Sequence, residues 1–325
     1  MEDMKMFEKI APDLYKIEIP LPGNPLKALN SYVFKTNDRN LIIDTGMNRP
    51  ECLDAMMTGL KELDINLAKT DLFITHMHAD HSGLISHLAT DTSTVYCSQL
   101  DGDIINSKDD WNDMLDFAKL SGFPSDEDAI RLHPGFKYRT HKEVNFTVDD
   151  ENDLISIGDY SFQCVWTPGH TPGHLCLYDE AKKILISGDH ILGRITPNIS
   201  LWSDDHSPLD EYLESLNKIY PMEIDLVLPA HRSLFTNCRE RIQQLRQHHD
   251  NRASEILSIL QSGPRNAFYI ASQMKWDLNF KHWDQFPITQ KWFATGEVIA
   301  HLKYLENLGE VYRSQTPQEI TFSLK

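Results

Sequence analysis

The segment ITHMHADHSG, residues 74–83, is the feature that most restricts how this chain can fold. It places His76, His78, Asp80 and His81 within six residues, directly after the apolar run 72–74. Imidazole and carboxylate groups are costly to hold together out of water unless they share a positive charge. Alternate residues of an extended segment point the same way, so His76 and His78 can bind one cation. Asp80 and His81, which follow the turn, would then face a second cation.

This segment needs further ligands from elsewhere in the chain, because a cation takes about four ligands and a catalytic one keeps a position for water. Three other polar residues lie where apolar β-like runs lead into turns. They are His170 in WTPGHTPGH, Asp189 in ILISGDH and His231 in LVLPAH. Ligands that leave strand ends can converge from a rigid scaffold. The joint pattern therefore predicts a metal centre built from distant parts of the sequence.

The first two thirds of the chain alternate β-like and helical segments. Pro, Gly and Asn separate runs that predict strands at 14–20, 30–36, 40–46, 71–76, 160–166, 174–179, 183–188 and 225–230. Helices are expected at 50–65 and 207–220, together with a helical insertion at about 99–128. Sheets flanked by helices belong to the layered α/β class. The expected fold class is therefore α/β.

Near residue 237 the pattern changes, and we expect a catalytic domain at 1–236 and a second domain at 237–325. Helical spacing of apolar residues predicts helices at 238–260 and 295–309, the latter ending at Gly309, with His248 and His249 on a solvated face. A hairpin formed by 311–315 and 319–325 would complete a small, mainly helical, winged-helix-like domain. The aromatic stretch 276–293 is expected near the cleft mouth or in a homodimer interface.

Composition limits the location and the partners of the protein. The chain has 325 residues, of which 41% are hydrophobic and 24% charged, and no apolar run approaches the roughly 18 residues that span a membrane. Its net charge of −17 disfavours nucleic acid and anionic membranes as partners. Five scattered cysteines without a CxxC pair indicate free thiols. With no export signal at the N-terminus, we expect a cytoplasmic protein.

The motifs ITHMHADHSG, TPGHTPGH, SGDH and LPAH, in that order, resemble those of the metallo-β-lactamase superfamily, as does DTG at 44–46. The resemblance covers about residues 10–235. It implies an αββα sandwich with a dinuclear site, usually of zinc, with iron or manganese as alternatives. The C-terminal third resembles the winged-helix domain of the branch that includes beta-lactamase-like protein 2 and relatives named after hydroxyacylglutathione hydrolase.

The resemblance also implies a role for each ligand. His76, His78 and His170 would hold the first metal, and Asp80, His81 and His231 would hold the second. Asp189 would bridge the two ions.

The expected activity is hydrolysis of a small-molecule thioester, ester or lactone by a metal-bridged hydroxide. Asp80 would orient the nucleophile. His174 would either donate to a developing oxyanion or serve only as a positioning residue, and these two roles stay open. Asp44 is interpreted as a group that fixes a metal-bound histidine, and His190 is expected to point away from the metals.

Two other functions compete with this one. A metal-dependent endoribonuclease acting on single-stranded RNA would need a basic groove with stacking aromatics. Residues 239–325 contain eleven basic and nine acidic residues, and the insertion 101–128 contains nine acidic residues against two lysines, so a nuclease is disfavoured. A diiron redox module or an inactive scaffold is disfavoured by His78 and by the intact ligand set.

Overall fold

The computed structural model describes residues 5–108, 111–124, 131–148, 151–277, 280 and 282–325. The chain divides into two compact units. The first contains residues up to 107, 134–197 and 218–241, and the second contains 108–133, 198–217 and 242–325. The second unit thus takes in two segments that precede the boundary expected at residue 237.

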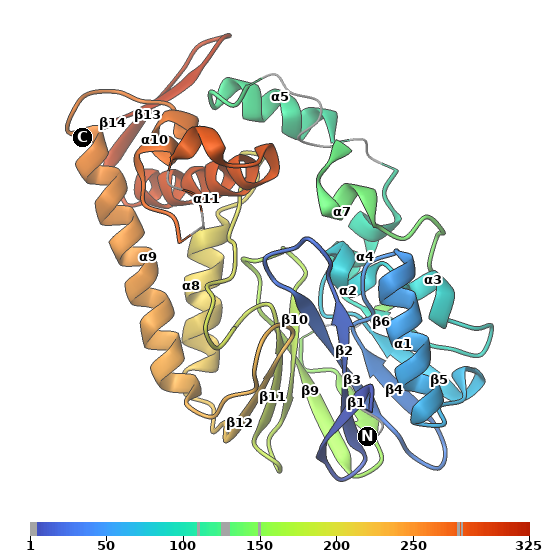
Figure 1. Ribbon diagram of the computed structural model, residues 1–325. Coiled ribbons are helices and arrows are strands. Elements are labelled where there is room, and N and C mark those ends of the chain that lie inside the picture. Colours follow the sequence, from blue (N-terminus) through green and yellow to red (C-terminus); the bar gives the residue numbers. More distant parts are fainter. Residues whose placement is uncertain (1–4, 109–110, 125–130, 149–150, 278–279, 281) are drawn as a thin grey trace. The chain divides into compact units, whose positions relative to one another are not determined.

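Two β-sheets form the centre of the first unit (Figure 1). The first has the strand order β1-β2-β3-β4-β5-β6-β7 and the second the order β12-β11-β10-β9-β8. The strands of the first sheet are β1 (Phe7–Ala11), β2 (Leu14–Pro20), β3 (Ala28–Phe34), β4 (Asn40–Ile43), β5 (Thr70–Phe73), β6 (Val95–Cys97) and β7 (Thr147–Val148). Those of the second are β8 (Leu154–Ile157), β9 (Tyr160–Trp166), β10 (Leu175–Asp179), β11 (Ile184–Gly188) and β12 (Leu226–Pro229). The strands expected from the sequence are all present: β2 and β9 have the expected ends, and each of the others has one or both ends shifted by one to three residues.

Alternation along the strands divides the core of this unit into two layers. In β4, Leu41 and Ile43 pack between the two sheets, where the second sheet contributes residues such as Phe162 and Leu177. Ile42, between them in sequence, faces the other side of the first sheet. Adjacent side chains of a strand point to opposite faces, so a strand buried on both faces is apolar throughout.

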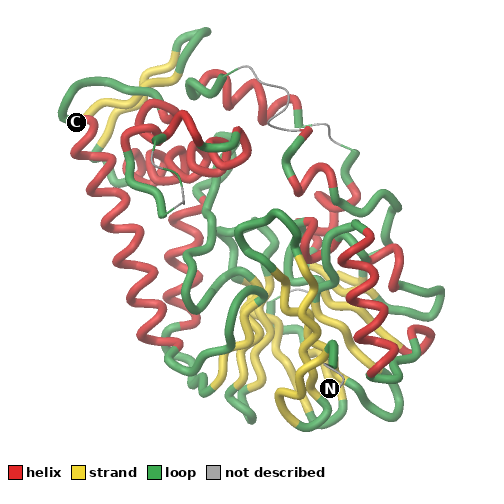
Figure 2. Tube along the Cα trace, in the orientation of Figure 1, coloured by secondary structure: helices red, strands yellow, loops and turns green. Residues whose placement is uncertain are grey.

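Helix α1 (Pro50–Glu62) covers the outer face of the first sheet (Figure 2). Its residues Cys52, Met56 and Leu60 join the core of that face. The spacing of four places all three on one side of the helix. The short helices α2 (Ala79–Ser82), α3 (Ile85–Leu88), α4 (Gln99–Asn106) and α7 (Pro134–Lys137) belong to the same unit, as does the 3₁₀ turn η1 (Leu67–Lys69).

The second unit is mainly helical. It contains α5 (Asn112–Leu120), α10 (Ala267–Gln273), α11 (Ile288–Asn307), the 3₁₀ turn η2 (Trp283–Gln285) and the hairpin β13 (Val311–Gln315) with β14 (Ile320–Leu324). Two further helices, α8 (Pro208–Ile219) and α9 (Cys238–Leu260), each run from one unit into the other. The predicted hairpin and helices are confirmed, although α11 begins seven residues before Thr295. The winged-helix assignment stays a prediction.

One expectation about this unit is wrong. His249 does not lie on a solvated face: it is 2% exposed and packs against His301 and Tyr212. The predicted end of α11 is correct, because Gly309 follows it with φ of 73°, a left-handed conformation that glycine adopts without strain. All five cysteines are buried thiols that form no disulfide, as predicted. Among the described residues, no helix is both long and apolar enough to cross a membrane.

Candidate metal centre

The predicted ligands all follow the carboxyl ends of strands of the first unit. Residues 76–81 follow β5, His170 follows β9, Asp189 follows β11 and His231 follows β12. Strands β4 and β5 are parallel, as are β11 and β12, so each pair delivers its following residues to one sheet edge. The two sheets are joined there, because the N–H of Leu175 donates to the carbonyl of Thr75 at 2.9 Å.

Hydrogen bonds between the sheets also fix the last ligand. The Asn30 side chain donates to the carbonyls of Pro229 and Arg232 at 2.9 and 2.7 Å, on either side of His231. The Nδ1–H of His231 donates to the carbonyl of Ala28 at 2.7 Å, which leaves Nε2 to face the site. A histidine whose other nitrogen is held in this way has a defined tautomer and ring orientation.

His76, His78 and His170 form the first group that could hold a metal ion. Nε2 of His76 lies 3.0 Å from Nδ1 of His78, and the His170 ring centroid lies 4.6 to 4.9 Å from the other two. Burial, reinforced by neighbouring imidazoles, lowers the pKa of His78 to about 3 and that of His76 well below its usual value. Both rings are therefore neutral at physiological pH, which is the form that binds a metal.

Asp80, His81 and His231 form a second group, and a third group of His76, His81 and Asp189 shares one histidine with each of the other two. Nε2 of His231 is 3.5 Å from Oδ2 of Asp80 and 3.4 Å from Oδ1 of Asp189. The other carboxylate oxygen of Asp189 is 3.4 Å from Nε2 of His170. Asp189 thus presents one oxygen to a ligand of each group.

These spacings fit a shared cation better than direct hydrogen bonding. N–H···O bonds are about 2.7–3.2 Å long, whereas the contacts around Asp189 are 3.4 to 3.8 Å. Ligands about 2.0–2.1 Å from a tetrahedral zinc ion lie about 3.3 Å from one another. The donor set of imidazole nitrogens and carboxylate oxygens is also one that zinc accepts.

The charges of this centre are balanced in a way that favours a cation. Burial by itself would raise the pKa of Asp80, but His81 and His231 lower it to about 2. Burial likewise opposes protonation of His231, yet Asp189 and Asp80 raise its pKa well above the usual value. The two carboxylates therefore stay ionised in a buried site, where a positive charge is needed to offset them.

Asp44 orients His81, one of the predicted ligands. Its carboxylate accepts hydrogen bonds from His81 Nδ1 at 2.8 Å and from both the backbone N–H and the hydroxyl of Thr75. Nε2 of His81 is thereby directed toward Asp80 and Asp189. Thr75 was missed by the sequence reasoning, because a threonine next to a histidine carries no specific signal.

His174 is buried beside the ligands with both ring nitrogens in hydrogen bonds. Nε2 accepts from the N–H of Asp189 at 3.2 Å, and Nδ1 pairs with the Thr167 hydroxyl at 2.8 Å. Of the two roles left open for His174, this geometry favours positioning of Asp189 over donation to an oxyanion. His190 is fully buried, and its ring lies 6.1 Å from that of His174.

Asp101 is a buried carboxylate whose role the sequence does not predict. It lies in α4, in the insertion predicted at 99–128, and accepts hydrogen bonds from Met77, Thr171 and Gly173. The only local signal is Ser98, three residues earlier, because serine is a preferred N-cap residue. In the structure the Ser98 hydroxyl accepts a hydrogen bond from the N–H of Asp101 and so caps α4. Contacts with residues 70 or more positions away leave no pattern in the sequence.

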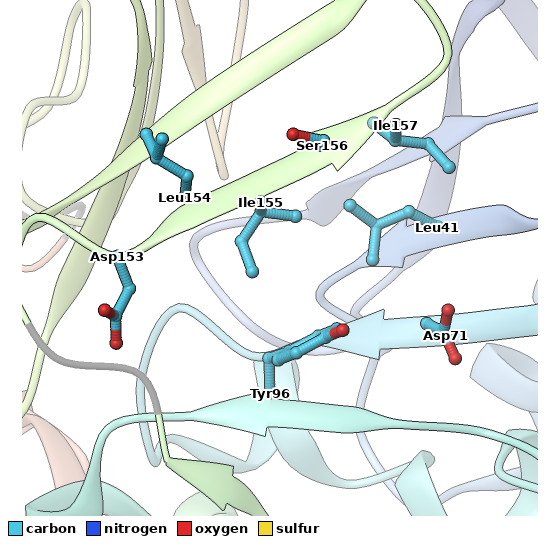
Figure 3. Close-up of a pocket in the computed structure, with 8 residues that line it drawn as sticks. All are labelled: Leu41, Asp71, Tyr96, Asp153, Leu154, Ile155, Ser156 and Ile157. Atoms are coloured by element: carbon cyan, nitrogen blue, oxygen red, sulfur yellow. The ribbon is translucent and has the colours of Figure 1, made fainter.

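A separate cavity of the first unit has none of these ligands in its wall (Figure 3). It lies between β8 and the neighbouring strands of the first sheet, and its lining consists of Leu41, Asp71, Tyr96 and residues 153–157.

Comparison with known proteins identifies the family of this chain. Residues 26–231 match the family model of the metallo-beta-lactamase superfamily. An atrochrysone carboxyl ACP thioesterase of Aspergillus fumigatus is 24% identical over 77% of this chain and 69% of its own length. A beta-lactamase-like protein 2 homolog of Caenorhabditis elegans is 25% identical over 78% of this chain and 72% of its own length. Other curated relatives are longer, and the chain spans 45 to 66% of their length.

Solved structures show the same fold over nearly the whole chain. A beta-lactamase domain protein from Burkholderia ambifaria is 26% identical, with a TM-score of 0.83 over 100% of this chain and 96% of that one. A metallo-beta-lactamase family protein from Thermus thermophilus is 24% identical, with a TM-score of 0.80 over 97% and 99%. The predicted α/β fold class is therefore confirmed. The chain belongs to the metallo-beta-lactamase superfamily and is a hydrolase of that superfamily, as its motifs predicted.

Proposed function

We propose that the protein is a dinuclear, zinc-dependent thioesterase acting on a small acyl thioester. The observation that carries the proposal is the convergence of seven buried or half-buried ligands, in two groups joined by Asp189, at one edge of the sandwich. The thioesterase named among its relatives supports a thioester substrate.

Each ligand would have one task. His76, His78 and His170 would hold one ion, Asp80, His81 and His231 would hold the other, and Asp189 would contact both. Two such cations supply Lewis acidity that makes water nucleophilic at neutral pH and polarises the substrate carbonyl. Asp80 would orient the attacking water through its carboxylate.

The surrounding residues would keep this arrangement in place. Asp44 holds the His81 ring, the Ala28 carbonyl holds the His231 ring, and His174 holds the backbone of Asp189. Preorganised ligands need no rearrangement as the reaction proceeds, which is the main source of electrostatic catalysis.

The test uses matched substrates with one acyl group, presented as an N-acetylcysteamine thioester, an oxygen ester and a lactone. Released thiol can be followed with a thiol reagent, because all five cysteines of the chain are buried. We expect the zinc-loaded protein to prefer the thioester, and metal analysis to give close to two ions per chain. The proposal would be overturned if the zinc-loaded wild-type protein hydrolysed the thioester no faster than the Asp80→Ala variant. Metal-dependent cleavage of single-stranded RNA in the same preparation would favour the nuclease alternative.

A further inference from the structure

We propose that Asp101 is a positioning residue that sets the spacing of the first ligand group by clamping its two loops together. The proposal rests on the proposed metal site but not on its substrate. One loop carries His76 and His78, and the other carries His170. Asp101 belongs to neither loop and contacts both.

The contacts reach the backbone between the ligands. Oδ2 of Asp101 accepts from the N–H of Met77 at 2.9 Å, and Met77 lies between His76 and His78. The same oxygen accepts from the hydroxyl of Thr171, directly after His170, at 2.6 Å. Oδ1 accepts from the N–H of Gly173 at 2.8 Å. A single carboxylate therefore joins the two loops whose separation decides how three imidazoles meet.

Asp101 is well placed to be rigid. Its side chain is fully buried and lies in the first turn of α4, which Ser98 caps. The far end of α4 is tied by Asn106, which exchanges two hydrogen bonds with the backbone of Val144 at 2.8 and 2.9 Å. A group held at both ends of its helix can impose a spacing on its neighbours.

The fit around the carboxylate leaves no spare room. A Cβ added at Gly173 would lie 2.6 Å from Oδ1 of Asp101 and 2.2 Å from the Ser98 hydroxyl. Glycine at 173 is therefore what allows the second loop to come close enough to donate its N–H. The Gly173→Ala substitution would push this contact apart while the charge of Asp101 is retained.

The protein offers a matched control in Asp179. This aspartate is 1% exposed, belongs to the same unit and also accepts two backbone N–H groups, from Ser161 and Lys182. It ends β10, whereas the ligand loops precede that strand. Asp179→Asn thus removes a comparable buried charge without touching a ligand loop.

The experiment measures zinc affinity by competition with a chromogenic chelator, using the full chain. Three variants are compared with Asp179→Asn: Asp101→Asn, Thr171→Val and Gly173→Ala. Loss of one contact that supports a metal ligand typically lowers the metal affinity by about 10- to 100-fold. We expect each of the three variants to lower the affinity for one ion by this factor. The affinity for the other ion should change less than about threefold. The His78→Ala and His231→Ala variants identify which ion is lost, since each removes a ligand of one group.

Two outcomes would overturn the proposal. If all three variants bind zinc with the same affinities as Asp179→Asn, Asp101 has no role toward the metal. Weakening in Asp101→Asn alone, with Thr171→Val and Gly173→Ala unchanged, would mean that its charge acts and that no clamp exists. Failure of thioester hydrolysis would leave these affinities unaffected, so the two proposals fail separately.

Discussion

Acid should destabilise the second unit through a buried pair of histidines. Nδ1–H of His301 donates to the carbonyl of Glu297 at 2.8 Å, one turn earlier in α11. Its Nε2 is then the acceptor for Nδ1–H of His249 at 3.1 Å. His301 is 1% exposed, and burial lowers its pKa to about 4. Burial also lowers the pKa of His249 well below its usual value.

The size of the effect follows from the pKa of His301. A histidine in the unfolded chain has a pKa of about 6.5, so the unfolded state binds more protons than the folded state between pH 6.5 and about 4. The stabilising contribution is complete above pH 6.5 and is lost as the pH falls through this window. At about 1.4 kcal/mol per unit, the loss is about 1.4 kcal/mol at pH 5.5 and about 3 kcal/mol at pH 4.

Denaturant unfolding followed by tryptophan fluorescence measures this loss. Five of the six tryptophans lie in the second unit, so the signal reports mainly on that unit. The wild type is compared with His301→Gln, which cannot titrate, and with His141→Gln, which changes an exposed histidine of the first unit. We expect the free energy of unfolding to fall less steeply from pH 7 to 4.5 in His301→Gln alone. Parallel curves for all three proteins would refute the reasoning.

Three further predictions concern the site and the organisation of the chain. Asp80→Ala should reduce thiol release by about 100-fold or more, and a residual rate near that of wild type would remove Asp80 from the mechanism. Gly83→Ala should lower both the melting temperature and the metal content, because a Cβ there would lie within 2.7 Å of three backbone atoms; unchanged melting would contradict this. Deletion of 237–325 should yield protein that elutes as aggregates in size-exclusion chromatography. The ring centroids of Trp202 and Trp292 lie 3.9 Å apart, so the deletion would expose Trp202. A soluble, monomeric truncation would show that the remaining chain needs no such cover.

Local patterns were enough to predict which candidate ligand residues come together and most of the strands. Asp189, for example, directly follows the apolar strand β11. Residues that follow neighbouring parallel strands lie together at one edge of a sheet, so their meeting can be expected from the sequence. The class of chemistry follows from the residue types, since imidazole and carboxylate groups in one cluster are suited to a cation. These features can be predicted because each depends on residues that are only a few positions apart in the sequence.

Other features depend on which distant segments meet, and only the tertiary structure decides that. Asp101 is an ordinary helix residue in the sequence, and it acquires its three partners because two loops fold around it. His249 looks like part of a polar helix face until α11 brings His301 against it. The second unit gathers residues 108–133 and 198–217 with the C-terminal region for the same reason. Burial and hydrogen-bond partners are properties of the packed chain, because side chains far apart in sequence compete for the same space.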